Sequence, residues 1–221
     1  MTAKDPIESL ATLRHEFGEH GGVNMSIEAS TTFTAMHPDI LSDIFTGERG
    51  PDKGGCYLYG RHFNPTVYNL SLQLAALEGT EAAYCTASGM AAISGTLLQL
   101  CNQGDHIVSA NTVYGGTYAL LHDFLPAKSG ITTTLVDITD LEAVEAAMQD
   151  NTRVLYAESI ANPTLRLANI PALAEIAHRH GAKLVIDNTF SPLIFSPRQL
   201  GADIVVHSMT KSIGGASDHI A

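Results

Sequence analysis

The sequence predicts an α/β fold, in which a mostly parallel sheet is covered by helices on both faces. Short apolar runs alternate with longer helical stretches from about residue 82 onward. Strands that are apolar along their whole length are typical of parallel sheets buried on both faces. The 221 residues, 45% of them hydrophobic, suffice for one sizeable core. Ligands of such folds bind at the carboxyl ends of the strands.

Each expected element follows from a local pattern. The strands are the short apolar runs at residues 82–87, 106–110, 131–136, 154–158, 184–187 and 204–207. Helices are expected at residues 90–100, 117–124, 141–148 and 170–180, where apolar residues recur at helical spacing. One more helix should be capped by Thr66 and end at Gly79. The first sixty or so residues are interrupted by glycines and predict an arm or loop region.

Charge and hydropathy exclude several classes of partner. The formal net charge is -11 and the sequence pI is near 5.2. Binding a nucleic acid needs clustered Lys and Arg, which this chain lacks. No run of about 18 apolar residues occurs, and the first residues contain no apolar signal-peptide core. We therefore expect a cytoplasmic protein without nucleic-acid or membrane partners.

The cysteines and histidines do not predict a metal site. Cys56, Cys85 and Cys101 are widely spaced and form no C-x-x-C pair, so free thiols are expected. Among the ten histidines, His15 and His20 miss the i,i+4 spacing of a zinc-binding helix by one residue. No metal is expected.

An amine and a carboxylate follow two of the expected strands. Lys211 comes shortly after residues 204–207, and Asp187 ends the apolar run Leu184-Val185-Ile186. Pyridoxal phosphate needs this pair, because a lysine forms a Schiff base with its aldehyde and a carboxylate keeps its pyridine nitrogen protonated. Singly, such a lysine is usually a solvated surface residue and such an aspartate a turn residue. A cationic ligand would explain an aspartate placed after a buried strand.

A candidate phosphate-binding turn accompanies this pair. Ser88, Gly89 and Met90 join a strand to a helix, where small residues let backbone N–H groups approach a phosphate. The hydroxyls of Ser208 and Thr210 are further donors. Alone, Ser88-Gly89 is a weak signal, since most such turns contain Gly or Ser for steric reasons.

Two more residues could complete the site. Tyr114 follows another strand, so its ring could stack on a cofactor or pack in the core. Asn162, in Asn162-Pro163-Thr164, offers an amide to the ring oxygen or to a substrate carboxylate, although a simple turn fits the sequence as well.

These motifs, in this order, resemble the Cys/Met-metabolism (transsulfuration) family of PLP-dependent enzymes. The resemblance covers nearly the whole chain, and its motifs are Tyr59-Gly60-Arg61, Asn64-Pro65-Thr66, Leu77-Glu78-Gly79, Ser88-Gly89-Met90, Tyr114-Gly115, Asn162-Pro163-Thr164, Asp187-Asn188-Thr189 and Ser208-Met209-Thr210-Lys211. It implies the large domain of the aspartate-aminotransferase-like fold (fold type I). Residues 61–221 would form this cofactor-binding domain, incomplete at its C-terminal end, and residues 1–60 an arm that contributes to the neighbouring subunit.

The resemblance also implies a role for each site residue. Lys211 would carry the cofactor and shuttle protons, Asp187 would pair with the pyridine nitrogen, and Tyr114 would stack and assist proton transfer. Gly89, Met90, Ser208 and Thr210 would hold the phosphate. Tyr59 and Arg61 would reach the active site of a neighbouring subunit, where the guanidinium binds phosphate in a forked geometry. A homotetramer, built as a dimer of dimers with shared sites, is implied.

The expected reaction is the α,γ-elimination of a sulfur amino acid. The sequences of Tyr59–Thr66 and Ala83–Met90 resemble those of plant-type methionine γ-lyases. At the position of Gly116, plant-type enzymes carry Gly, whereas bacterial and protozoal ones typically carry Cys. The expected products from L-methionine are methanethiol, 2-oxobutanoate and ammonia. The alternatives are cystathionine γ-synthase, cystathionine γ-lyase or O-acetylhomoserine sulfhydrylase activity.

Two further alternatives are open. Ser208-Met209-Thr210-Lys211 also spells the S-x-x-K of serine β-lactamases, but the chain has Ser217-Asp218-His219 instead of S-D-N and no K-T-G. Members of the family that the motifs resemble are about twice this length, and their smaller C-terminal domain supplies the arginine for the substrate carboxylate. The sequence is therefore also compatible with an inactive truncated fragment.

Overall fold

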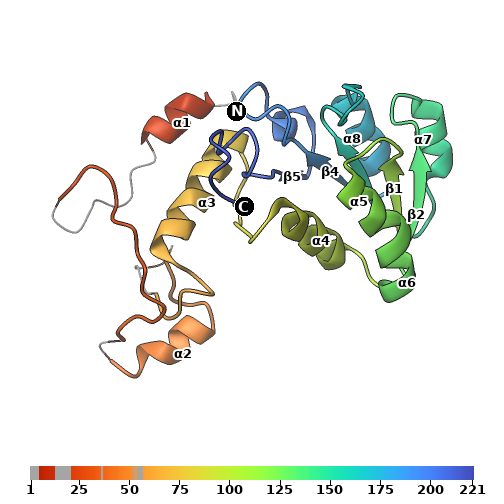
Figure 1. Cartoon of the computed structure of the whole chain (residues 1–221). Coiled ribbons are helices and arrows are strands. Elements are labelled where there is room, and N and C mark those ends of the chain that lie inside the picture. Colours follow the sequence, from red (N-terminus) through yellow and green to blue (C-terminus); the bar gives the residue numbers. More distant parts are fainter. Residues whose placement is uncertain (1–4, 13–20, 36, 52, 54–56) are drawn as a thin grey trace. The chain divides into compact units, whose positions relative to one another are not determined.

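The computed structural model describes residues 5–12, 21–35, 37–51, 53 and 57–221 (Figure 1). The chain divides into two compact units, Met1–Cys85 and Thr86–Ala221. Cys56, which the sequence predicts to be a free thiol, lies outside the described residues, whereas Cys85 and Cys101 are free thiols. None of the helices in the described ranges is long and apolar enough to cross a membrane.

In the part of the first unit that the structure describes there are three helices: α1 (Pro6–Thr12), α2 (Ile40–Phe45) and α3 (Pro65–Glu78). The two short ones lie in the region where glycines predict an arm or loop. Because they are only 7 and 6 residues long, they carry too few apolar repeats for their period to stand out in the sequence. Helix α3 matches the predicted helix and ends at Gly79, whose φ of 67° is left-handed.

The predicted cap of α3 is wrong by two residues. Asn64, not Thr66, is the N-cap, and its side-chain oxygen accepts the N–H groups of Thr66 (2.9 Å) and Val67 (3.3 Å). Pro65 takes the first helical position, where its missing N–H costs nothing. The Thr66 hydroxyl instead accepts the Glu28 N–H at 2.9 Å, which fixes the preceding loop to the helix.

The second unit is built on a five-stranded parallel sheet of order β2-β1-β3-β4-β5. Its strands are β1 (His106–Ala110), β2 (Thr132–Val136), β3 (Thr152–Glu158), β4 (Lys183–Asp187) and β5 (Ile204–Val206). The order reverses between β1 and β3, and this switch point is where open α/β sheets bind ligands. The α/β fold class predicted from the sequence is confirmed.

Helices cover both faces of this sheet (Figure 1). Because crossovers between parallel strands are right-handed, the connection from β1 to β2 lies on one face and the connections that run the other way lie on the opposite face. The first face carries α4 (Gly89–Leu100), α5 (Gly115–Ala119), the π-helix η1 (Leu120–Phe124) and α6 (Leu125–Ser129). The second carries α7 (Leu141–Ala147) and α8 (Ile170–Arg179), which contact each other.

Burial in the sheet explains why its strands read as apolar runs. Residues 106–110 of β1 are all buried, and so are most residues of β3 and β4. The largest fully buried side chains include Tyr156, Leu97, Leu121 and Ile186, which come from the sheet and from the helices on it. A 3-10 helix, η2 (Pro197–Leu200), leads into β5.

One predicted strand is absent. Residues 82–87 form no strand in the structure, and Tyr84 within them is 71% exposed. An apolar run becomes a strand only where a neighbour completes its hydrogen-bond ladder, and none of the described strands pairs with this segment. The helix predicted at residues 117–124 extends further in both directions, through the π-helix η1 to Ser129. Pro126 lies where the π-helix gives way to α6. Proline has no N–H that could bond to the preceding turn.

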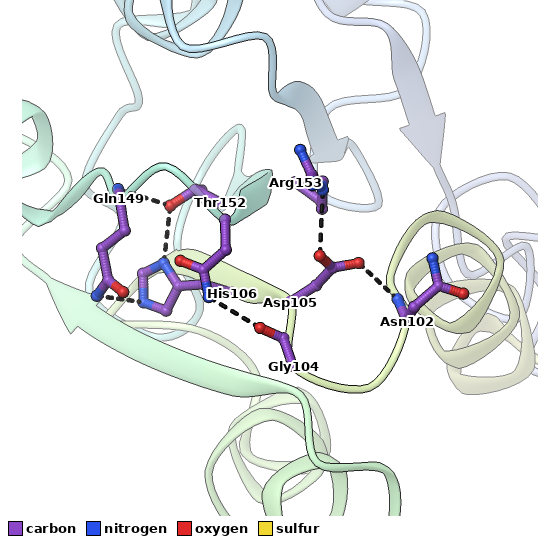
Figure 2. A network of polar contacts seen from close by, with 8 residues as sticks. Asn102, Gly104, Asp105, His106, Gln149, Thr152 and Arg153 are labelled. Atoms are coloured by element: carbon purple, nitrogen blue, oxygen red, sulfur yellow. Dashed lines mark hydrogen bonds and ion pairs between the residues drawn. The ribbon is translucent and has the colours of Figure 1, made fainter.

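A polar network closes the amino-terminal edge of the sheet (Figure 2). His106 is 1% exposed, and its Nδ1 and Nε2 lie 2.8 Å from the hydroxyls of Thr152 and Thr134. Beside it, Asp105 accepts hydrogen bonds from Arg153 Nε (3.1 Å) and the Asn102 N–H (2.7 Å). Since a neutral imidazole both donates and accepts, the two hydroxyls are matched to the uncharged ring. Burial lowers the pKa of His106.

We expect the free energy of unfolding to depend on His106 between pH 8 and 5.5. Because the pKa is lower in the folded chain than in the unfolded one, the unfolded state binds more protons as pH falls, and stability is lost below the unfolded value. Each unit of depression corresponds to about 1.4 kcal/mol. Urea unfolding at the two pH values should show this loss in the wild-type chain. The loss should be smaller in His106→Asn and unchanged in His122→Gln, which removes an exposed histidine; equal losses in all three would contradict this role.

Candidate functional site

Most predicted site residues of the second unit follow strands that run in one direction, so these residues lie beyond the same edge of the sheet. Tyr114 follows β1, Asn162 follows β3, Asp187 ends β4, and Ser208 follows β5. Parallel pairing places Glu158, Asp187 and Val206 side by side as Cα partners. The carboxyl edge therefore gathers residues that are up to about a hundred positions apart in sequence.

The turn at the start of α4 lies directly against this edge. Ser88 is the N-cap of the 12-residue helix, and its hydroxyl accepts the Ala91 N–H at 3.1 Å. Gly89 and Met90 occupy the first helical positions, where N–H groups have no partner within the helix. A Cβ on Gly89 would lie 2.7 Å from Ser208 Cβ. Glycine thus allows the first turn of α4 and the residues after β5 to approach each other, with the Ser208 hydroxyl next to the helix N-terminus.

We expect Gly89→Ala to destabilise the chain by about 1–3 kcal/mol, because the added methyl overlaps Ser208 in a packed contact. The matched control is Gly95→Ala in the same helix, where a Cβ would meet nothing within 4 Å. That control should stabilise the chain by about 0.5–1 kcal/mol through helix propensity alone. Urea denaturation of both variants measures the difference, and destabilisation of similar size at both positions would refute the steric explanation.

Asp187 and Ser208 are connected through Thr189, which was not predicted as a site residue from the sequence. The Thr189 N–H donates to Asp187 Oδ1 at 2.9 Å, and its hydroxyl accepts the Ser208 N–H at 2.8 Å. The hydroxyl of Tyr156, which is fully buried, lies 3.5 Å from Asp187 Oδ2. Burial, followed by the charge of Asp187, raises the pKa of Tyr156, so the phenol stays protonated and can donate.

No described Lys, Arg or His forms an ion pair with Asp187. Two hydrogen-bond donors, the Tyr156 hydroxyl and the Thr189 N–H, contact its carboxylate, and the residue is only partly exposed. A carboxylate so placed stabilises a positive charge brought by a ligand.

Glu158 is a second site residue that sequence reasoning missed. It is only 7% exposed, and its Oε1 accepts the Tyr114 N–H at 2.6 Å while Oε2 accepts the Asn162 N–H at 2.9 Å. This carboxylate therefore brings together the two loops on either side of the switch point. The signal was present in the sequence, because Glu158 ends an apolar strand just as Asp187 does.

Tyr114 itself is 51% exposed, so its ring is not a core side chain. A Cβ on Gly116 would lie 2.7 Å from Tyr114 Cε1 and 3.2 Å from Met90 Sδ. Any larger residue at position 116 would have to displace the tyrosine ring. Gly116 thus fixes how the ring lies beside the first turn of α4.

The remaining predicted residues of the second unit lie after β5. Lys211 is exposed, and no other described residue forms a hydrogen bond or ion pair with its amine. The Thr210 hydroxyl accepts the Ala221 N–H at 2.8 Å and donates to the Ala221 main-chain oxygen at 2.9 Å. The same oxygen lies 3.5 Å from the Ser208 hydroxyl. Both hydroxyls can therefore converge on one oxygen atom.

Tyr59 and Arg61 belong to the first unit. The Arg61 guanidinium lies 4.8 Å from the centre of the Tyr59 ring, a cation–π contact. Both line a pocket of about 320 Å³, together with Ala29, Ser30, Thr31, Gly60 and Asn64. Arg61 is exposed, so its donors can bind an anion.

The second unit fits pyridoxal phosphate. The approach of Gly89 to Ser208 leaves N–H groups and hydroxyls for a phosphate, no described residue brings a cation to Asp187, and Lys211 offers an amine. This fold and this set of donors define the class of PLP-dependent enzymes.

The family model for Cys/Met metabolism PLP-dependent enzymes matches residues 9–221, and the chain belongs to this family. It is 61% identical over 218 residues to the methionine gamma-lyase of Arabidopsis thaliana, covering 98% of this chain and 49% of that one. It is 45% identical to the O-succinylhomoserine sulfhydrylase of Pseudomonas aeruginosa, covering 90% and 47%. The structure of metB from Corynebacterium glutamicum superposes with a TM-score of 0.85 at 37% identity, covering 98% and 54%. The chain thus spans about half the length of these relatives.

Proposed function

We propose that this chain is the cofactor-binding part of a PLP-dependent carbon–sulfur lyase, which converts L-methionine to methanethiol, 2-oxobutanoate and ammonia. One observation carries the proposal. The Asp187 carboxylate, which has no cationic partner among the described residues, occurs in the same unit as the close approach of Gly89 to Ser208. The choice of methionine is supported by the 61% identity to the Arabidopsis thaliana enzyme. Gly116 agrees with the plant-type sequences.

When bound, pyridoxal phosphate supplies an aldehyde that condenses with amines and a ring that accepts electrons. Lys211 would hold it covalently and, once displaced by the substrate amine, would move protons at the α- and β-carbons. Asp187 would keep the proton on the ring nitrogen, supported by Thr189 and Tyr156. Tyr114 would stack on the ring, and Asn162 would donate its amide to the ring oxygen.

The phosphate would be held by the Gly89 and Met90 N–H groups and the hydroxyls of Ser208 and Thr210, with the Ser88 hydroxyl fixing the helix turn. Tyr59 and Arg61 would complete the site of a neighbouring subunit, with residues 1–60 as the connecting arm and a homotetramer as the assembly. We propose a cytoplasmic location, in keeping with the acidic composition.

The proposal is tested by reconstituting the 221-residue chain with pyridoxal phosphate, reducing it with borohydride and mapping the modified residue. Modification of Lys211 is the expected result, and no visible band after reconstitution would reject the cofactor assignment. Activity is tested in parallel on the 221-residue chain and on a version extended to the length of its relatives. Methanethiol and 2-oxobutanoate should appear from methionine at least with the extended version.

A second candidate is γ-replacement, in which a thiol displaces the leaving group of an acylated homoserine. It is favoured by the 45% identity to the O-succinylhomoserine sulfhydrylase of Pseudomonas aeruginosa. A substrate panel with methionine, cystathionine, O-acetylhomoserine and O-succinylhomoserine separates the two. Turnover of a homoserine ester with a thiol, without release of methanethiol from methionine, would establish the second candidate instead.

A further inference from the structure

We infer that Glu158 is a positioning residue, which holds the loops of Tyr114 and Asn162 in the arrangement that cofactor binding requires. The inference rests on the proposed function, because it assigns a task to these loops in the same site. It adds a residue whose two side-chain oxygens are both occupied by main-chain N–H groups, so that it acts through the loops that carry them.

The geometry connects two loops that no strand pairing connects. Tyr114 lies in the connection from β1 to β2, and Asn162 in the connection from β3 to β4. β1 and β3 are neighbours in the sheet, but their connections leave on opposite sides of the switch point. The two oxygens of Glu158 accept one main-chain N–H from each, at 2.6 Å and 2.9 Å. One carboxylate thereby sets the separation of the two loops.

Only the ionised form can do this. A carboxylate accepts at both oxygens, whereas a protonated acid or an amide presents one donor to one of the two N–H groups. Burial raises the pKa of Glu158, the N–H groups of Tyr114 and Asn162 lower it, and the charge of Asp187 raises it again. Protonation therefore sets in at a higher pH than for an exposed glutamate, and it would release one loop.

The side chains that the two loops carry are exposed, which indicates that they bind a ligand rather than pack in the core. The Tyr114 ring is half exposed, and the Asn162 side chain is exposed with no hydrogen bond to another described residue. Burying a charge is costly unless it is paired or fully hydrogen-bonded. The buried charge of Glu158 is explained if the Tyr114 and Asn162 side chains, which it positions, bind a ligand. We infer that this ligand is the ring of the cofactor.

The direct test is amide hydrogen exchange in the chain without cofactor. Glu158→Gln should accelerate exchange at the Tyr114 and Asn162 amides about tenfold at one or both sites, since one charge-assisted hydrogen bond is lost. Glu78→Gln is the matched control, because Glu78 is similarly buried at 8% exposure but lies in α3. That control should leave both amides unchanged. Unchanged exchange at both amides in folded Glu158→Gln would overturn the inference.

A second readout follows the protonation itself. In the wild-type chain, exchange at these two amides, corrected for its intrinsic pH dependence, should accelerate as Glu158 is protonated at acidic pH. Glu158→Gln should show no such transition. Should Glu158→Gln fail to fold, Glu158→Asp keeps the charge but is one methylene shorter, so it should deprotect one amide; protection of both would refute the inference.

Titration with pyridoxal phosphate connects the positioning to the ligand. We expect Glu158→Gln to weaken cofactor affinity about tenfold and Glu78→Gln to leave it unchanged. If the wild-type chain binds the cofactor and Glu158→Gln binds it equally well, the positioning role is wrong while the proposed function stands. If the wild-type chain takes up no cofactor, the proposed function fails, whatever the exchange data show.

Discussion

Lys211→Ala should abolish covalent attachment of pyridoxal phosphate to the 221-residue chain. The side chain is exposed beyond the end of β5, and no other described residue occupies its amine with a hydrogen bond or ion pair. An amine without an internal partner is available for condensation with an aldehyde. Borohydride reduction followed by peptide mapping should find the label on Lys211 in the wild-type chain and none in the variant. In an extended, active version, turnover should fall by about three orders of magnitude or more, because nucleophile and base are removed together.

Lys183→Ala is the matched control. Lys183 begins β4 at the opposite edge of the sheet, and its amine donates to Asp203 at 2.9 Å. We expect the control to keep its label on Lys211 and to lose little stability, as is usual for an exposed ion pair. Labelling of Lys211→Ala at the wild-type level would show that another residue carries the cofactor.

Asp187→Asn should weaken cofactor binding by two to three orders of magnitude. Removing one partner of a buried charge pair costs about 3–5 kcal/mol, and the asparagine also offers no charge to keep the ring nitrogen protonated. The substitution keeps the size of the side chain, so the Thr189 N–H retains an oxygen acceptor. Equilibrium titration followed by the visible absorption of the cofactor measures the loss.

Asp137→Asn is its control. Asp137 also directly follows a strand of the parallel sheet, but its carboxylate is engaged by Thr139 and Arg166, which lower its pKa to about 2. This variant should bind the cofactor as the wild type does. Comparable losses at both positions would mean that Asp187 acts only through the general charge of this edge.

The sheet was predictable because burial on both faces leaves a direct trace in sequence. The central residues of β3 and β4 form short apolar runs, β1 has three apolar residues of five, and the bounds of each strand were predicted within one or two positions. Residues 82–87 have the same trace without forming a strand, since pairing depends on a neighbour far along the chain. The cap of α3 was misplaced for a related reason. Both Asn64 and Thr66 are good caps, and the choice was decided by the loop at Glu28 that binds Thr66.

The site was predictable where chemistry requires one residue type at one place. Asp187, Gly89 and Lys211 are predictions of this kind, and the structure places Asp187 at the end of β4 and Gly89 against Ser208. Glu158 and Thr189 were missed because they act through main-chain N–H groups of other loops, and such partners are set by the fold rather than by sequence spacing. Whether Tyr59 and Arg61 reach a neighbouring subunit stays a prediction, since one chain contains only one half of such a contact.

The brevity of β5 would give a bound cofactor a second role. This three-residue strand pairs, among the described strands, only with β4, yet Ser208, Thr210 and Lys211 all follow it. Short edge elements open at a small fraction of the free energy needed for global unfolding. A ligand that binds both Lys211 and the hydroxyls after β5 would stabilise this edge strand against local opening. Cofactor supply would then govern the lifetime of the folded chain, and starvation for it would expose this strand first to proteolysis.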